Sequence, residues 1–187
     1  MHGVIIGTRR MTRNLPTGIT WDVLEPTIND GTHYGCLHSH LSVWSTVYEH
    51  TIVVEDDCIF QRSLDVSELL PQARQWDFLY LGGQPISWKP PTKGMQASDL
   101  GSRGFCRTHA YVIGLGAAIQ LTNWKWDPTE PWGMIPEWRV GLRVGLLWPP
   151  LAGQAEGTSS ITGRTVPERW WYTPYDHAVS EHLNNER

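Results

Sequence analysis

Short apolar runs, each followed by a turn or a polar stretch, recur along the chain and predict the strands of a sheet. They occupy residues 3–7, 51–54, 77–81 and 145–148, and a further short strand is expected at residues 19–24. Runs in which nearly every residue is apolar are typical of strands covered on both faces, as in parallel sheets flanked by helices. The pattern therefore predicts an α/β unit centred on one sheet.

Helical periodicity appears in residues 32–49, where apolar side chains recur every three or four positions. Cys36 and His40 lie four residues apart in this segment, so they share one face of the expected helix. His40 is interpreted either as a hydrogen-bonded packing histidine or as a participant in chemistry. Two shorter helices are expected at residues 66–75 and 114–121.

The middle and the end of the chain are less regular. Residues 84–103 are polar and contain several prolines and glycines, which predicts a long loop of the kind that often serves as a lid or binding loop. Residues 105–113 return to strand character. Residues 137–145 follow a proline and are expected to form a short helix with Glu137 in its first turn, and a polar helix is expected from Asp176.

Three consecutive carboxylates, Glu55, Asp56 and Asp57, follow the apolar run at residues 51–54. Adjacent like charges repel one another, and a buried carboxylate without a partner costs several kcal/mol. A divalent cation would neutralise the cluster, whereas the alternative is a solvated acidic turn. Side chains alternate along a strand, so continued strand geometry would place Glu55 and Asp57 on one face and Asp56 on the other.

Length and composition limit the classes to which the protein can belong. The 187 residues fit one domain, and a net charge of −4 gives no overall electrostatic footprint for nucleic acid. The three cysteines include no Cys-x-x-Cys pair, which indicates neither a disulfide framework nor a structural zinc site. No signal peptide and no apolar run of about 20 residues is found, so we expect a cytoplasmic protein without integral membrane association.

The loop after the first apolar run carries Arg9, Arg10 and Arg13. Guanidinium groups at this place are suited to binding a phosphate or diphosphate, and a surface arginine cluster is the alternative. Arginine exceeds lysine throughout, since the chain has only three lysines, and this favours a GC-rich actinobacterial or phage source.

Several segments match a known pattern in the right order. Residues 35–44 have the spacing Gly-x-x-x-Ser-His-x-x-x-Trp and are followed by the apolar run that ends in Glu-Asp-Asp. Residues 77–82, 108–113 and 149–154 look like later blocks of the same pattern. The ordered set resembles glycosyltransferase family 25, the lipooligosaccharide and collagen galactosyltransferase group, over nearly the whole chain.

The resemblance implies a single-domain GT-A glycosyltransferase with a Rossmann-like, mostly parallel sheet flanked by helices. Residues 1–83 would form the nucleotide-sugar-binding half, and residues 84–187 the acceptor-side half and C-terminal tail. A sugar would move from a nucleotide-diphosphate donor to an acceptor hydroxyl, with Mn²⁺ or Mg²⁺ as cofactor. Asp57 and Glu55 would hold the metal, and the donor would be bound by Thr8, Arg9, Arg13, His40, Glu55, Asp56 and Gln154.

The resemblance also supplies a catalytic base. Members of family 25 invert the anomeric centre, which requires a base on the acceptor hydroxyl. The family commonly has Pro-x-Asp before its last helix, where this chain has Ile135, Pro136 and Glu137, so Glu137 is the predicted base. A first-turn glutamate favoured by the helix dipole is the alternative. The amino terminus also departs from the family, which usually has an Asn-Leu pair followed by an arginine.

Other classes and two acceptors stay open. An acidic cluster near a histidine also serves metal-dependent hydrolases and nucleases, and a non-catalytic carbohydrate-binding module would use the 11 tryptophans to stack on sugars. The acceptor would be a glycan or a hydroxymethylated pyrimidine in phage DNA. DNA would bind a basic and aromatic surface, for which a packed tail over the core is the alternative, made of Arg139, Arg143, Arg164, Arg169, Trp170 and Trp171.

Overall fold

The chain is represented by a computed structural model that describes residues 1–7, 12–26, 33–85, 96–99, 105–106, 108–125, 141–158 and 165–170. Within these segments there are three helices and thirteen short or long strands. None of the described helices has the length and apolar character needed to span a membrane.

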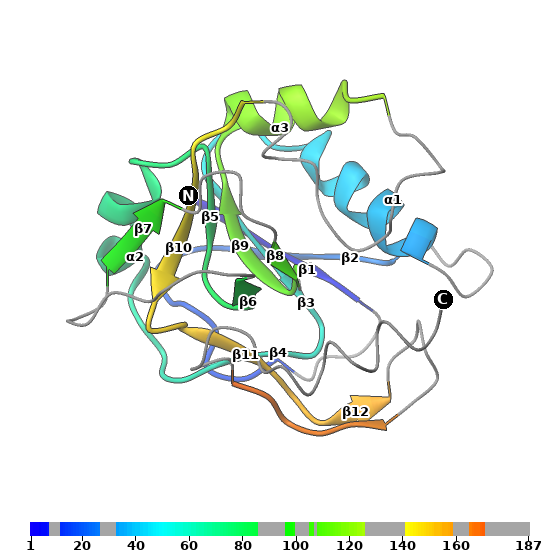
Figure 1. Cartoon of the computed structure of the whole chain (residues 1–187), viewed down its shortest axis with the longest axis vertical. Coiled ribbons are helices and arrows are strands. Elements are labelled where there is room, and N and C mark those ends of the chain that lie inside the picture. The colour runs from blue at the N-terminus through cyan, green and yellow to red at the C-terminus, as the bar shows by residue number, and fades with distance from the viewer. Residues whose placement is uncertain are drawn as a thin grey trace.

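A seven-stranded mixed sheet forms the centre of the fold (Figure 1). In spatial order its strands are β2 (Trp21–Leu24), β1 (His2–Ile6), β3 (Thr51–Glu55), β9 (Ala110–Ile113), β5 (Phe78–Tyr80), β10 (Val144–Trp148) and β7 (Gln96–Asp99). Strands β2, β1, β3, β5 and β10 run in one direction, and β9 and β7 run against them. The predicted α/β fold with a mostly parallel sheet is confirmed.

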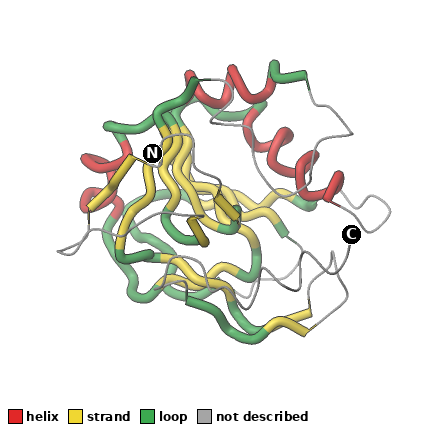
Figure 2. The backbone as a smooth tube through the Cα atoms, viewed as in Figure 1, coloured by secondary structure: helices red, strands yellow, loops and turns green. Residues whose placement is uncertain are grey.

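Helices cover both faces of this sheet, which explains why its strands are so apolar (Figure 2). Helices α1 (His33–Trp44) and α3 (Leu115–Thr122) pack on one face, and α2 (Val66–Ala73) packs on the other. Successive residues of β3 alternate between the two cores: Val53 joins the cluster under α1 and α3, whereas Ile52 and Val54 join the cluster under α2. All three are 0% exposed, as expected for a strand buried on both sides.

Smaller strand pairs lie outside the main sheet. Strand β4 (Cys58–Phe60) pairs with β11 (Ala152–Gln154), β6 (Gln84–Pro85) with β8 (Phe105–Cys106), and β12 (Gly157–Thr158) with β13 (Thr165–Val166). The β4–β11 pair bears on the candidate site, because its register sets Cys58 opposite Gln154.

Two predictions for the middle of the chain are corrected by the structure. The polar stretch at residues 84–103, predicted as a loop, contains β6 and the edge strand β7. Strand β7 has β10 as its one sheet neighbour, and a strand at the margin of a sheet does not need a continuous apolar sequence. Residues 105–113, predicted as one strand, divide into β8 and β9, because β8 pairs with β6 and not with the main sheet.

One edge of the sheet gathers the ends of several strands. Strands β1 and β3 are parallel with Ile6 beside Glu55, so their carboxyl ends lie together. Strand β9 runs the other way and brings its amino end to the same edge, where the amide of Glu55 donates to the carbonyl of His109 over 3.0 Å. Ligands of open α/β sheets bind at the carboxyl ends of the parallel strands. This edge is therefore the place to look for a site.

Candidate functional site

The acidic triplet forms a turn at this edge and does not continue β3. Strand β3 ends at Glu55. The turn consists of Asp56 and Asp57, and β4 begins at Cys58. The expectation that strand alternation places Glu55 and Asp57 on one face is therefore wrong, because the strand geometry stops before the two aspartates. Each of the three carboxylates contacts a different part of the edge.

Glu55 faces α1 and the start of β9. Oγ1 of Thr108 donates a hydrogen bond to Oε1 of Glu55 over 2.9 Å, and Nε2 of His40 lies 3.4 Å from the same oxygen. Burial opposes the charge of Glu55, but the contact with His40, the charge of His109 and the Thr108 hydrogen bond together lower its pKa to about 2. Glu55 is therefore a carboxylate at neutral pH.

A buried network orients His40 from the opposite side of its ring. The hydroxyl oxygen of Tyr111 lies 2.7 Å from Nδ1 of His40 and accepts a hydrogen bond from Nε1 of Trp44 over 2.9 Å. Burial disfavours the protonated imidazole, yet Tyr111, Cys36 and Glu55 together raise the pKa of His40 well above its ordinary value. The ring is held with Nδ1 toward Tyr111 and Nε2 toward Glu55.

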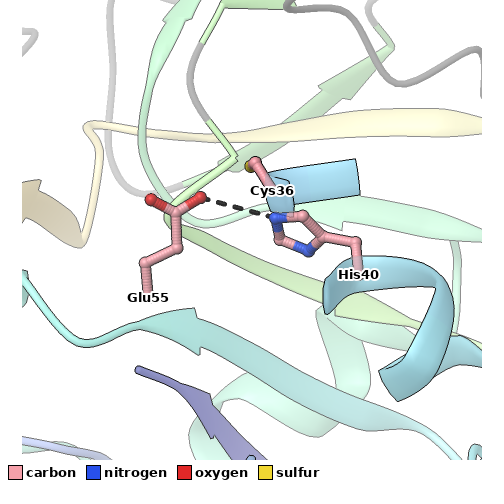
Figure 3. Close-up of side chains that lie close together, drawn as sticks. All are labelled: Cys36, His40 and Glu55. Carbon is pink, nitrogen blue, oxygen red and sulfur yellow. Dashed lines mark ion pairs between the residues drawn. The ribbon is translucent and has the colours of Figure 1, made fainter. Parts of the chain in front are cut away.

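Cys36 joins His40 and Glu55 in a candidate metal-binding group (Figure 3). Cys36 and His40 come from the same face of α1, and Glu55 approaches them from the end of β3. One ligand atom from each residue lies within 4.8 Å of the other two. In the part of the chain that the structure describes, no other group of three His, Cys, Asp or Glu side chains is close enough to hold a metal ion.

Asp57 contacts β11. Nε2 of Gln154 donates a hydrogen bond to Oδ2 of Asp57 over 2.7 Å, and the amide of Ala155 donates to the Asp57 carbonyl over 2.7 Å. Oδ1 of Asp57 and Oε1 of Gln154 are buried and have no hydrogen-bond partner among the described residues. Burial, followed by the charges of Glu55 and Asp56, raises the pKa of Asp57 to about 6. Two buried acceptor oxygens on neighbouring side chains suit a hard cation or the donors of a ligand.

Asp56 lies over Gly7, the residue that follows β1. A β-carbon added at Gly7 would overlap the side chain of Asp56, and the φ angle of Gly7 is +156°. Both facts require glycine at this position. The end of β1 is therefore in direct contact with the acidic turn, beside the place where the predicted donor-binding loop begins.

The structure brings a majority of the predicted site residues to this edge: His40, Glu55, Asp56, Asp57 and Gln154. Arg13 lies beside β4 on the surface, where its guanidinium pairs with Glu168 at 2.8 Å and its side chain is 60% exposed. Thr8, Arg9 and Glu137 fall outside the described residues. The roles assigned to these residues, including the shared metal of Asp57 and Glu55, stay predictions.

The basic and aromatic surface considered for DNA is divided between two places. Arg143 pairs with Asp77 at 2.9 Å, where β5 and β10 begin, on the edge opposite the acidic turn. Arg169 instead exchanges backbone hydrogen bonds with Gln154, and Trp170 packs over the backbone of β11. Arg143 and Arg169 therefore do not share one surface. The remaining members lie outside the described residues: Arg139, Arg164 and Trp171.

Sequence reasoning gave no role to Cys36, Thr108 or Tyr111. Cys36 carries a usable signal, because its spacing of four from His40 places both on one helical face. Thr108 and Tyr111 carry none. A hydroxyl in or beside an apolar strand does not reveal which distant helix it will face.

The sequence matches no protein-family model and no curated protein. Among solved structures, the fold is similar to the crystal structure of A197 from STIV, with a TM-score of 0.50 and 10% sequence identity. The match covers 95% of this chain and 99% of that chain. The likeness agrees with the predicted α/β fold, a mostly parallel sheet flanked by helices. At this level of identity the likeness shows the fold alone, and membership of family 25 stays a prediction.

Proposed function

We propose that the protein transfers a sugar from a nucleotide-diphosphate donor to an acceptor hydroxyl, with a divalent cation at the acidic turn. The observation that carries the proposal is the position of Glu55, Asp56 and Asp57. They cluster at the carboxyl edge of parallel strands in an α/β sheet, which is where open α/β sheets bind ligands.

The oxygen donors at the turn fit the proposed cation. Oδ1 of Asp57 and Oε1 of Gln154 are buried acceptors without partners among the described residues, and hard oxygen ligands suit Mn²⁺ or Mg²⁺. Asp57 is the proposed direct ligand, with Glu55 in support. When bound, such an ion stabilises the charge that develops on a departing nucleotide diphosphate.

The proposed donor contacts extend from the turn into the segment after β1. Gly7 touches Asp56, so the loop that carries Thr8 and Arg9 begins beside the acidic turn. Arg13 would have to exchange its ion pair with Glu168 for a donor phosphate. Exposed ion pairs are worth roughly 0–1 kcal/mol, so that exchange costs little.

In the proposed reaction the acceptor oxygen forms a bond to the anomeric carbon of the sugar as the bond from that carbon to the diphosphate oxygen breaks. The carboxylate of Glu137 takes the proton of the acceptor hydroxyl, and the configuration at the anomeric carbon inverts. The proposed acceptor is a glycan. The separation of Arg143 from Arg169 supports this choice over a modified pyrimidine in DNA.

The test is to incubate the protein with Mn²⁺ and a panel of nucleotide sugars and to follow the release of nucleotide diphosphate. We expect slow donor hydrolysis that depends on Mn²⁺. Asp57→Asn should abolish both hydrolysis and Mn²⁺-dependent binding of nucleotide diphosphate in calorimetry. Asp22→Asn, which changes a carboxylate on β2 with a 69% exposed side chain, should leave both unchanged. Cleavage of a phosphodiester would indicate a nuclease. If the protein neither hydrolyses a donor nor binds nucleotide diphosphate with Mn²⁺, the proposal is contradicted.

A second variant separates the base from the donor site. Glu137→Gln should abolish transfer to a glycan acceptor and leave donor binding nearly intact, because the amide keeps the shape of the side chain and cannot accept the proton. Transfer at the unchanged rate would remove Glu137 from the mechanism.

A further inference from the structure

We infer that Cys36, His40 and Glu55 form a site for one zinc-class ion, separate from the oxygen-rich site proposed at Asp57 (Figure 3). The inference goes beyond the proposed transfer reaction and does not depend on it, although Glu55 is common to both. It rests on four observations: the direction in which Nε2 of His40 faces, one interatomic distance, the contacts that hold the ligands, and the presence of a thiol.

Nε2 is the nitrogen of His40 that faces Glu55, because Nδ1 lies against Tyr111. The hydroxyl oxygen of Tyr111 accepts from Nε1 of Trp44 and lies 2.7 Å from Nδ1 of His40, so it either accepts a hydrogen bond from Nδ1 or donates one to it. When Nδ1 carries the only ring proton, Nε2 directs a lone pair at Oε1 of Glu55. Two acceptor atoms that face each other need a cation between them, and that cation is either a proton or a metal ion.

The separation of these two atoms leaves room for a metal ion. Nε2 of His40 and Oε1 of Glu55 are 3.4 Å apart. A hydrogen bond from an N–H group to an oxygen typically spans about 2.7–3.2 Å. With zinc–nitrogen and zinc–oxygen bonds of about 2.0–2.2 Å, two ligand atoms at corners of a tetrahedron lie roughly 3.3–3.6 Å apart. The observed distance matches the edge of a tetrahedron and exceeds the hydrogen bond.

Both ligands are held in place by further hydrogen bonds, as metal ligands usually are. Tyr111 fixes the ring of His40, and Oγ1 of Thr108 donates to Oε1 of Glu55 over 2.9 Å. Oγ1 of Thr108 also lies 3.3 Å from Nε2 of His40, so it is the competing partner if a proton occupies the gap. The experiment below therefore has to distinguish a metal ion from a proton.

The thiol of Cys36 decides which class of ion the site prefers. Thiolate and imidazole together suit Zn²⁺ and other borderline ions, whereas Mg²⁺ and Mn²⁺ prefer oxygen ligands. His40 is buried, but Cys36 and Glu55 are only partly buried, so an ion can reach the group from the solvent side. Three protein ligands leave a fourth position for water or another ligand, which distinguishes this site from closed structural sites with several cysteines.

Cobalt titration tests the site directly, because Co²⁺ occupies zinc sites and its bond to a thiolate gives a charge-transfer band in the near ultraviolet. The full chain is stripped with a chelator and titrated with Co²⁺ alone. We expect a band that saturates at one equivalent, disappears in Cys36→Ser, and persists in Cys58→Ala, which removes a buried cysteine of the other core face. A parent chain without the band, or a band that persists in Cys36→Ser, overturns the inference.

Labelling of Cys36 keeps the test decisive if Cys36→Ser does not fold. The unchanged chain is treated with iodoacetamide, and modification of the Cys36 peptide is followed by mass spectrometry. Zn²⁺ should abolish labelling of Cys36, because a metal-bound thiolate is a poor nucleophile, whereas Mg²⁺ should have no effect. Equal labelling with and without Zn²⁺ would show that only a proton lies between His40 and Glu55.

Two further variants identify the positioning residue and separate this site from the transferase site. Tyr111→Phe should weaken Co²⁺ binding about 10–100-fold and retain the band, because the ligands stay and only their orientation loosens. Asp57→Asn should leave Co²⁺ binding unchanged while it abolishes binding of nucleotide diphosphate with Mn²⁺. Loss of Co²⁺ binding in Asp57→Asn would contradict the separation of the two sites.

Discussion

Gln154 donates a hydrogen bond to Asp57 over 2.7 Å and so joins the acidic turn to a strand 97 residues further along the chain. The antiparallel pairing of β4 with β11, which sets Cys58 opposite Gln154, fixes this contact. The bond leaves Oδ1 of Asp57 and Oε1 of Gln154 buried without partners in the described segments. The turn is thus held firmly while two acceptor oxygens stay available to a ligand, an arrangement that costs stability.

That cost predicts that Asp57→Asn stabilises the metal-free protein. The pKa of Asp57 is raised from its ordinary value of 3.8 to about 6. The folded state binds this proton more tightly than the unfolded state, so the free energy of unfolding falls as the pH rises between those two values and stays low above them. Asparagine does not ionise, so the variant should be more stable by about 1–2 kcal/mol at neutral pH.

Urea unfolding in the presence of a chelator measures this difference. The gap between parent and Asp57→Asn should shrink as the pH is lowered and close below the ordinary pKa of 3.8, where both side chains are neutral. A variant that is less stable than the parent at neutral pH would show that folding does not disfavour the ionised carboxylate of Asp57.

The contact between Gly7 and Asp56 predicts that Gly7→Ala disturbs the acidic turn. The added methyl group would overlap Asp56, and a φ of +156° is a region that favours glycine. The free energy of unfolding should fall by about 1–3 kcal/mol. Mn²⁺-dependent binding of nucleotide diphosphate should weaken as well, because the turn has to move.

A matched control is Gly116→Ala in α3, where an added β-carbon meets nothing within 4 Å. Alanine is favoured over glycine in helices, so this variant should gain up to about 0.5–1 kcal/mol and bind nucleotide diphosphate normally. Denaturant unfolding and calorimetry on both variants check the pair. If Gly7→Ala behaved like Gly116→Ala, the contact between Gly7 and Asp56 would not constrain the acidic turn.

The sheet was predictable because burial on both faces leaves a clear trace in the sequence. Residues 52–54 of β3 alternate between two cores and are all apolar, so the run at residues 51–54 stands out, and so do the carboxylates that end it. Strand β7 leaves no such trace. Its polar sequence, Gln96–Asp99, is compatible with a loop, and only its pairing with β10 makes it a strand.

The site was predictable to the extent that local spacing or family resemblance carries it. The triplet is local, and Cys36 and His40 share a helical face by spacing alone. The directions of the three carboxylates were not predictable, because they depend on where β3 stops. Nor was Tyr111, since its hydroxyl meets Trp44 and His40 only through the packing of α1 on the sheet.

The ion pair of Asp77 with Arg143 predicts a pH-dependent contribution to stability at the opposite edge. The carboxylate accepts from the Arg143 backbone amide at 2.8 Å and from its guanidinium at 2.9 and 3.1 Å. The guanidinium hydrogen bonds, against the effect of burial, lower the pKa of Asp77 below 3.8. A lowered pKa stabilises the fold above the ordinary value, and this stabilisation is lost as the pH falls through the lowered one.

Asp77→Asn should therefore reduce the free energy of unfolding at neutral pH by about 0.5–1 kcal/mol, a modest value because the pair is partly exposed. The loss should disappear in strong acid, where the parent carboxyl is protonated too. Urea unfolding at neutral pH and below the ordinary pKa measures both. A deficit of the same size at both pH values would assign the effect to packing and not to charge.

The buried hydroxyl of Tyr111 predicts a coupled loss of stability. In Tyr111→Phe, Nε1 of Trp44 loses its acceptor and Nδ1 of His40 loses its partner, both in the core. An unsatisfied buried donor costs about 1–3 kcal/mol, so Tyr111→Phe should lower the free energy of unfolding by about that amount. The control is Tyr48→Phe, at a residue that is 67% exposed, which should change stability by less than about 0.5 kcal/mol. A double-mutant cycle with Trp44→Phe isolates the hydrogen bond from the cavity that the smaller ring leaves, because the cavity is common to both backgrounds. Coupling of about 0.5–3 kcal/mol is expected, and additive losses would show that the contact between Trp44 and Tyr111 does not stabilise the network.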